Sequence, residues 1–223
     1  MKLIHYIINI CIGFSFFFVS CTAEEELPSQ ELGYVYLSGI ELTNEGELLP
    51  ATKAVDEKLQ IEIWKNGEIV PGQSFLPGKV PEVLTLSPGA YILKAFTPEY
   101  ETEADSGKKG SAAYNKEYEF SLVSGDNLRI NLKAPMVNIG VGFNLSSDFS
   151  TAFTNYTITV ISGLRSYTIS PNNKSDICYF NMPASGKLNY TIAATNVSGD
   201  PFFTQKELSV VNGTIYTINI DIK

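Results

Sequence analysis

Histidine is nearly absent from this sequence, since the single one, His5, lies at the extreme amino terminus. The rest of the chain therefore lacks the usual general base for a serine or cysteine nucleophile. Three cysteines in 223 residues are too few for a disulfide scaffold or a thiolate zinc site. No glycine-rich phosphate loop opens a helix, because no long stretch has helical spacing. We predict that the protein is not an enzyme and has no catalytic residues, no metal site and no cofactor.

Clusters of basic residues are also missing. The chain has 16 Lys and Arg against 24 Asp and Glu, which gives a formal net charge of −8. The acidity lies in the amino-terminal half, because the part beyond Lys133 is about neutral. Contacts with phosphate groups need Lys and Arg, so we predict no nucleic-acid partner.

What the sequence does contain begins with a long apolar run. Lys2 supplies one positive charge, an almost wholly apolar stretch follows over residues 3–19, and the small residue Ser20 closes the segment. This layout is typical of a secretory signal peptide, which we predict for residues 1–20. The apolar stretch borders on the length needed to span a bilayer, so an uncleaved anchor is the alternative.

The residues at the end of this run, Phe18-Val19-Ser20-Cys21, resemble the lipobox of bacterial lipoproteins in the looser form of Bacteroidetes-type bacteria. Phe18 stands where the stricter pattern has leucine. The resemblance implies that the Cys21 sulfur carries a diacylglyceryl group and that the chain is cut before this residue. Two or more acyl chains would attach the protein stably to a membrane. The alternative is a secreted protein in which Cys21 is incidental.

Three consecutive glutamates follow, Glu24, Glu25 and Glu26. They resemble the export signal that directs such lipoproteins to the outer face of the outer membrane. The alternative is a solvated acidic tether, which short charge runs usually form. We assign residues 21–32 to this tether and predict a lipid-anchored outer-membrane protein that faces the cell exterior.

Beyond residue 32 the sequence is typical of β structure. Short runs rich in Val, Ile, Tyr, Phe and Thr alternate with turn residues, as in residues 59–63, 91–95 and 156–160. Asn66-Gly67 predicts a two-residue hairpin turn. We therefore predict an all-β fold.

The same order of elements occurs twice. SLVSGDNLRINLK (121–133) aligns with SVVNGTIYTINID (209–221), and VLTLSPGAYILKA (83–95) resembles CYFNMPASGKLNYTIAA (178–194). LQIEIWKNG likewise resembles YTITVISG, and GYVYL resembles VNIGVGF. The repeat predicts two tandem Greek-key β-sandwich domains, transthyretin-like or immunoglobulin-like, at residues 33–135 and 136–223, with Pro135 at the junction. The alternative is one larger sandwich with generic β patterning.

The halves differ at residues 96–117, where the first half carries a longer connection. Such insertions often carry binding functions. Tyr100 and Tyr114 could act as stacking surfaces there, although we expect the segment to be a mobile, solvated loop. Its spacing does not match a calcium loop, although it offers four acidic side chains, Glu99, Glu101, Glu103 and Asp105.

Three single residues on predicted strands need an interpretation. Trp64, the only tryptophan, is expected in a core because large aromatics dominate small sandwich cores. The alternative is a sugar-stacking platform. Glu62 lies between two isoleucines and is expected on the solvent side of its strand. Cys178 is expected to be a small buried hydrophobe.

Two stretches, LPGKVPEVLTLSPGAYILKAFTPE and YEFSLVSGDNLRINLKAPMVNIGVGF, resemble the Bacteroidetes lipoprotein family catalogued as domain of unknown function 4493. The resemblance rests on a Pro-Gly turn, an aromatic-x-x-x-Ala strand and a later Gly turn, so it implies architecture rather than activity. The plan is also similar to fimbrillin-type adhesins, which pair a lipobox with two transthyretin-like sandwiches.

The sequence thus predicts a noncatalytic surface lipoprotein, an adhesin or a fimbria-like anchor or assembly component. Its partners would be other surface or fimbrial subunits, bound by strand addition at a sheet edge such as residues 216–223. The only arginines are Arg129 and Arg165, so the early arginine that fimbrillin maturation requires is absent, which favours an anchor over a shaft subunit. The alternative is a glycan-binding module of a surface polysaccharide-uptake system, with contacts from Tyr100, Tyr114 and Trp64.

Overall fold

The computed structural model describes residues 31–44, 47–48, 58–98 and 100–222. These residues form fifteen strands in four sheets, together with one short α-helix and one 3-10 turn. The all-β prediction is confirmed.

The first half of the chain forms two sheets. One sheet has the strand order β4-β3-β6-β7; in the other, β1 pairs with β2, β5 and β8. The strands are β1 (Gly33–Asn44), β2 (Glu47–Leu48), β3 (Gln60–Lys65), β4 (Glu68–Phe75), β5 (Val83–Leu86), β6 (Gly89–Phe96), β7 (Asn115–Leu122) and β8 (Asn127–Pro135).

The second half repeats this topology, except that none of its described strands corresponds to β2. Its sheets have the orders β11-β10-β13-β14 and β12-β9-β15, so the repeat predicted from the sequence corresponds to two equivalent sandwiches. The elements are β9 (Ile139–Leu145), α1 (Ser147–Ala152), β10 (Asn155–Ser162), β11 (Arg165–Ile169), η1 (Pro171–Asn173), β12 (Cys178–Phe180), β13 (Lys187–Thr195), β14 (Pro201–Ser209) and β15 (Ile215–Ile220).

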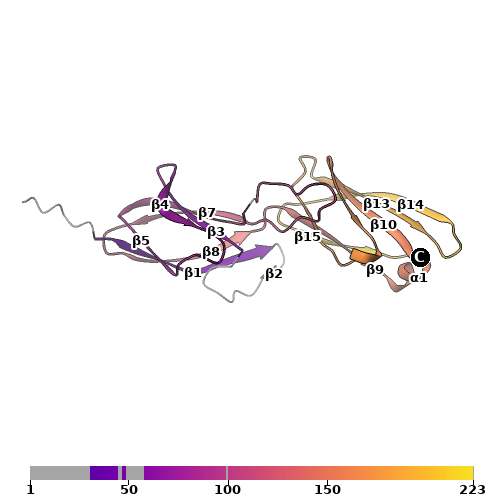
Figure 1. The fold of residues 1–223 in the computed structure, drawn as a ribbon, viewed down its shortest axis with the longest axis horizontal. Coiled ribbons are helices and arrows are strands. Elements are labelled where there is room, and N and C mark those ends of the chain that lie inside the picture. Colours follow the sequence, from indigo (N-terminus) through magenta and orange to yellow (C-terminus); the bar gives the residue numbers. More distant parts are fainter. Residues whose placement is uncertain (1–30, 45–46, 49–57, 99, 223) are drawn as a thin grey trace, which may run out of the picture.

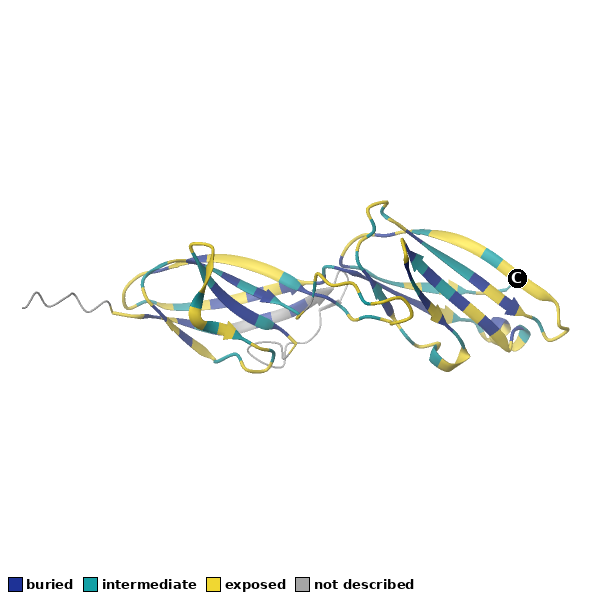
Figure 2. Cartoon of the chain, turned by 45° about the horizontal axis from the view of Figure 1, so that its top comes forward, coloured by how far each residue is buried: buried dark blue, intermediate teal, exposed yellow. Residues whose placement is uncertain are grey.

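Alternation along the strands builds two separate hydrophobic cores. In β6, for example, Tyr91, Leu93 and Ala95 are buried while the residues between them are not. The first cluster runs from Val35 to Met136 and the second from Ile139 to Val210. Figure 2 shows the buried residues along the facing strands of both sandwiches. The domain boundaries at residues 135 and 136 stay a prediction.

The first and last strands of each sandwich are parallel neighbours. β1 pairs with β8, and β9 pairs with β15. The chain therefore enters each sandwich at one end and leaves it at the opposite end. As a result, the two sandwiches lie end to end along the long axis of the molecule, and the carboxyl terminus lies far from the start of β1 (Figure 1).

Two local features show how sequence sets the backbone. Asn66 and Gly67 have φ angles of 54° and 84°, as a two-residue hairpin turn requires, so the predicted turn is confirmed. The helix α1 was not predicted. It begins after Ser146, whose side chain accepts a hydrogen bond from the Phe149 backbone N–H at 3.1 Å, a standard N-cap. The helix buries Phe149 in the second core.

Candidate functional site

An open groove with a volume of about 730 Å³ lies over strands β3, β6 and β7 of the first sandwich. We call it the Trp64 groove. Its lining combines an indole ring with charged and polar side chains, and includes Trp64, Asn66, Ile92, Lys94, Glu119 and Ser121.

Strand alternation places Trp64 on the outer face of the sheet. Ile61 and Ile63 are fully buried in the first core, whereas Trp64 is half-buried and lines the groove. The expectation of a core tryptophan is therefore wrong. The alternation of β3 outweighs the general preference of large aromatics for cores.

The carboxylate of Glu62 anchors the indole. Trp64 Nε1 donates to one carboxylate oxygen at 2.9 Å, and Gln60 Nε2 donates to the other at 2.9 Å. Ser74 Oγ donates a longer bond of 3.5 Å. Glu62 thus lies on the outer face as expected, but it is only 9% exposed and its charge is compensated by hydrogen bonds.

Lys94 covers the indole ring from the neighbouring strand. Its Nζ lies 4.3 Å from the Trp64 ring centre and 2.8 Å from Glu117 Oε1. The ammonium group is attracted to the ring face while the ion pair holds it in place. The groove therefore presents a fixed aromatic ring beside hydrogen-bonding groups, which is an arrangement suited to binding.

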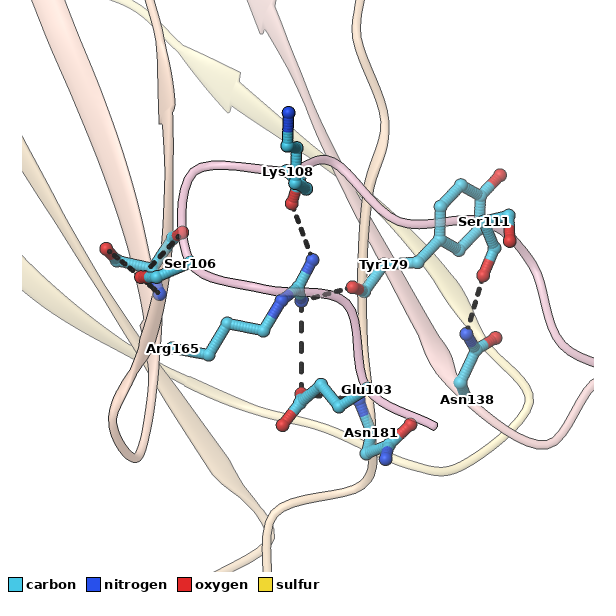
Figure 3. Close-up of polar contacts among 9 residues, drawn as sticks. Glu103, Ser106, Lys108, Ser111, Asn138, Arg165, Tyr179 and Asn181 are labelled. Carbon is cyan, nitrogen blue, oxygen red and sulfur yellow. Dashed lines mark hydrogen bonds and ion pairs between the residues drawn. The ribbon is translucent and has the colours of Figure 1, made fainter. Parts of the chain in front are cut away.

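The long connection between β6 and β7 docks on the second sandwich. Gly107 N–H donates to Ser166 O at 2.8 Å, and Tyr179 N–H donates to Lys109 O at 2.7 Å. Figure 3 shows this segment alongside the second-half strands. We call residues 103–113 the clasp. Many of its side chains are exposed, but the expectation of a mobile, solvated loop is wrong for its backbone.

Arg165, at the start of β11 in the second sandwich, binds the clasp through its side chain. Its Nη2 donates to Lys108 O at 2.7 Å and its Nη1 donates to Tyr179 O. The guanidinium lies 4.2 Å from the Phe180 ring centre, and Glu103 Oε1 is 3.9 Å from Nη1. Burial lowers the pKa of Arg165, and the Glu103 carboxylate opposes that shift. Sequence reasoning missed this role, although Arg165 is one of only two arginines.

The side chain of Asn138 closes the junction between the sandwiches. Its Nδ2 donates to Ser111 O at 2.8 Å (Figure 3), and its Oδ1 accepts from Ala113 N–H at 3.0 Å. The backbone continues this contact, because Val137 N–H donates to Ala113 O at 2.7 Å. Both ends of the clasp are therefore fixed, and the two sandwiches are joined by more than the connecting chain.

The two tyrosines predicted as ligand contacts have different surroundings. Tyr114 is 4% exposed and belongs to the first core, so its ring offers no open face. Tyr100 is half-buried; its ring centre lies 5.5 Å from that of Phe96 and its hydroxyl donates to Glu101 at 2.9 Å. Partial burial and Glu101 raise the pKa of Tyr100. Neither tyrosine lines the Trp64 groove, so the structure does not gather the three aromatics into one site.

Asp176 gives the clasp region a pH-dependent contact. Tyr167 donates to Asp176 Oδ2 at 2.5 Å, and Lys109 Nζ lies 3.3 Å from Oδ1. The tyrosine hydrogen bond in particular lowers the pKa of Asp176 from its ordinary value of 3.8. Because the folded pKa is lower, this contribution to stability is fully present above about pH 4 and is lost as the pH falls through the folded value.

We expect Asp176→Asn to flatten the fall in the free energy of unfolding between about pH 5 and about pH 3. Urea unfolding at these two pH values measures the effect. Tyr167→Phe removes the hydroxyl that donates to Asp176 and accepts from Asn173, and it should flatten the profile in the same direction. If both variants keep the wild-type pH dependence, Asp176 is not the responsible group.

The described residues bury their one thiol, that of Cys178. They contain no group of three or more His, Cys, Asp or Glu side chains placed to bind a metal ion. Cys178 is fully buried, as expected, and its Sγ donates to Val141 O at 3.2 Å. Burial raises the pKa of this thiol to about 12.

Cys178 is therefore expected to resist thiol reagents in the folded protein, since the thiolate is the reactive form. Modification with Ellman's reagent near pH 8 should proceed at Cys178 only after urea unfolding, with Cys178→Ala as the blank. Rapid modification of Cys178 in the native protein would contradict the buried position.

The predicted anchor lies outside the described residues. Cys21 and the run Glu24, Glu25 and Glu26 belong to the first 30 residues, so lipidation and export stay predictions. Over the part of the chain that is described, none of the helices has both the length and the apolarity to cross a membrane.

The fold defines the class of protein: an all-β protein of two tandem sandwiches. Residues 31–223 match the family described as Domain of unknown function (DUF4493). The chain belongs to this family, as the sequence resemblance indicated. No curated protein matches the chain.

Solved structures from Bacteroides are similar to this chain. A putative cell adhesion protein from Bacteroides uniformis has 10% sequence identity and a TM-score of 0.51, with 85% of this chain and 93% of that chain covered. A putative cell adhesion protein from Bacteroides eggerthii has 13% identity and a TM-score of 0.45 over 86% and 88% of the two chains. A fimbrial protein from Bacteroides ovatus has 7% identity and a TM-score of 0.44, covering 86% of this chain and 48% of its own.

Proposed function

We propose that this chain is a noncatalytic outer-membrane lipoprotein displayed on the cell surface, where it acts as an adhesin or a fimbria-like anchor or assembly component. The observation that carries the proposal is the end-to-end arrangement of the sandwiches, with β1 at one end and the carboxyl terminus far from it (Figure 1). Lipid on Cys21, about a dozen residues before β1, would leave the second sandwich furthest from the membrane. The fold shared with the Bacteroides uniformis cell adhesion protein supports this role.

The edge strand β15 is the proposed contact for a partner subunit. Ile218 and Ile220 point toward the second core but are only half-buried, whereas Ile130 and Leu132, at the equivalent positions of β8, are buried. A strand added beside β15 would cover this partly open core, and its backbone would supply the ladder hydrogen bonds. Partner subunits bound in this way would be other surface or fimbrial proteins.

The anchor is tested with Cys21→Ala. The unchanged protein should enter the detergent phase of a Triton X-114 extraction and carry fatty acid at its first residue by mass spectrometry. The variant should remain in the aqueous phase, and protease treatment of intact cells should digest the unchanged protein. Absence of fatty acid, or full protection from protease, would contradict the anchor or the surface location respectively.

The partner surface is tested with Ile218→Lys, and Thr217→Lys serves as the matched control because Thr217 is exposed on the same strand. Cross-linking on intact cells should capture neighbouring surface subunits with the unchanged protein and with the control. The Ile218 variant should capture at least about fivefold less, because a buried lysine opposes docking of an apolar strand. Equal capture by both variants, or the absence of any captured subunit, would contradict the assembly proposal. It would not bear on the proposed lipid anchor at Cys21.

The second candidate is a glycan-binding module of a surface polysaccharide-uptake system. The Trp64 groove favours it, because the groove combines a fixed indole with hydrogen-bonding groups. An adhesin and a glycan-binding module both need a surface that recognises a ligand, so this groove matters for either role.

A further inference from the structure

We propose that the Trp64 groove binds a neutral oligosaccharide, which stacks one sugar ring on the indole of Trp64. This inference deepens the proposed surface function by assigning its ligand-binding site. The apolar C–H face of a sugar ring matches an aromatic surface, while its hydroxyl groups need polar partners. The groove supplies both, since Asn66, Glu119 and Ser121 line it together with the indole.

The indole is held in place before any ligand arrives. Glu62 accepts the indole N–H at 2.9 Å, and it is itself held by Gln60 and Ser74. Lys94 Nζ lies over one face of the ring, 4.3 Å from its centre, and is fixed by Glu117 at 2.8 Å, while the indole still lines the groove. A ring that is already oriented loses little conformational entropy on binding, which favours affinity.

The internal repeat shows that Trp64 and the charged residues around it, Glu62, Lys94 and Glu117, are not needed to build the sheet. β3 pairs with β6 in the first sandwich just as β10 pairs with β13 in the second. When the two sandwiches are aligned by these pairs and by the hairpin turns that follow β3 and β10, Trp64 aligns with Ile161. By the same alignment, the three charged residues around Trp64 have uncharged equivalents in the second sandwich. Glu62 corresponds to Thr159, Lys94 to Thr191, and Glu117 to Gln205.

The second sandwich therefore forms the same four-stranded sheet without an aromatic ring or this charge network at those positions. A purely structural role does not explain why the first sandwich buries a carboxylate to orient an outward-facing indole. Ligand binding does explain it.

The charge of the groove selects against acidic ligands. The Lys94 ammonium is neutralised by Glu117, and the Glu62 carboxylate is covered by its donors. Glu119 is exposed, and the described residues place no cation within ion-pair distance of it. The net charge of the chain is also −8. An acidic polysaccharide would meet like charge, so a neutral saccharide is the chemical class that fits.

The experiment uses the only tryptophan of the chain as its reporter. Full-length protein in a polyoxyethylene detergent is titrated with neutral hexasaccharides of four types: α-glucan, β-glucan, β-mannan and xylan. At least one should change the tryptophan emission saturably, because Trp64 lies at the contact. Hexagalacturonate, an acidic probe of equal length, should bind at least about tenfold more weakly. No response to any neutral probe, or equal binding of the acidic one, would overturn the proposal.

Two variants locate the site. Trp64→Ile introduces the residue that the second sandwich carries at the equivalent position, so it should fold, as far-UV circular dichroism will check. By calorimetry it should bind the responding hexasaccharide at least about tenfold more weakly. Unchanged affinity would overturn the location. If the variant fails to fold, Glu119→Gln keeps the reporter and should reduce discrimination against hexagalacturonate to about threefold or less.

The matched control is Glu207→Gln, because Glu207 occupies the position of Glu119 in the second sandwich. It should leave both affinities unchanged, and an equal effect of the two changes would place the ligand elsewhere. These measurements use purified protein and require neither the lipid anchor nor a cell surface. A failure here is therefore distinguishable from a failure of the detergent-partitioning and protease tests of the surface proposal.

Discussion

Arg165→Met is expected to lower the free energy of unfolding of the second sandwich by about 3 kcal/mol. The guanidinium is 5% exposed and donates to two backbone oxygens, those of Lys108 and Tyr179. Methionine fills much of the volume but leaves both carbonyl oxygens without this donor, and it also removes the cation from the Phe180 ring. Urea unfolding followed by far-UV circular dichroism measures the change.

The chain offers a matched control in its other arginine. Arg129 is exposed on β8, where its guanidinium lies 5.1 Å from the Tyr36 ring centre. Arg129→Met is expected to change stability by less than about 0.5 kcal/mol. Small-angle scattering should also show a wider range of shapes for the Arg165 variant, because the clasp loses its central donor. Equal stability and equal scattering of the two variants would show that Arg165 does not fasten the clasp.

Phe149→Ala is expected to destabilise the second sandwich by about 4 kcal/mol, as large-to-small changes of buried phenylalanine do. Phe149 is 1% exposed and its ring centre lies 5.0 Å from that of Phe153 and 5.5 Å from that of Tyr156. Removal of the ring leaves a cavity under α1 that its aromatic neighbours cannot fill without moving. Urea unfolding by circular dichroism reports the loss.

Phe203→Ala is the corresponding control on an exposed strand. Phe203 lies in β14 and is 68% exposed, so its removal should cost less than about 0.5 kcal/mol. A comparable loss from both changes would mean that α1 does not close the second core.

Much of the fold could be predicted from the sequence, because it depends on local patterns. Alternating apolar residues and the Asn66-Gly67 turn determine strands and hairpins within a few residues of one another. The repeat predicted two sandwiches of one topology, but the strand order within each sandwich depends on pairing between distant strands and was not predicted. The alternation of Ile61 and Ile63 places Trp64 outside the core, but the sequence prediction followed the general preference of large aromatics for cores and was wrong.

The clasp could not be predicted in this way. Gly107 bonds to Ser166, and Lys108 to Arg165, across nearly 60 residues of chain. Such contacts depend on where two finished sandwiches come to lie, and no local periodicity encodes that. The helix α1 was missed because its six helical residues are too few to show a periodic pattern.

The parallel pairing of first and last strands has a mechanical consequence. Tension between a tethered amino end and a load at the carboxyl end would pull β1 and β8 in opposite directions along their shared ladder. The nine residue pairs that join them, and the six that join β9 and β15, would then be sheared together rather than unzipped one by one. Rupture must break the whole ladder at once, so the strand arrangement of both sandwiches resists stretching between the two ends of the molecule.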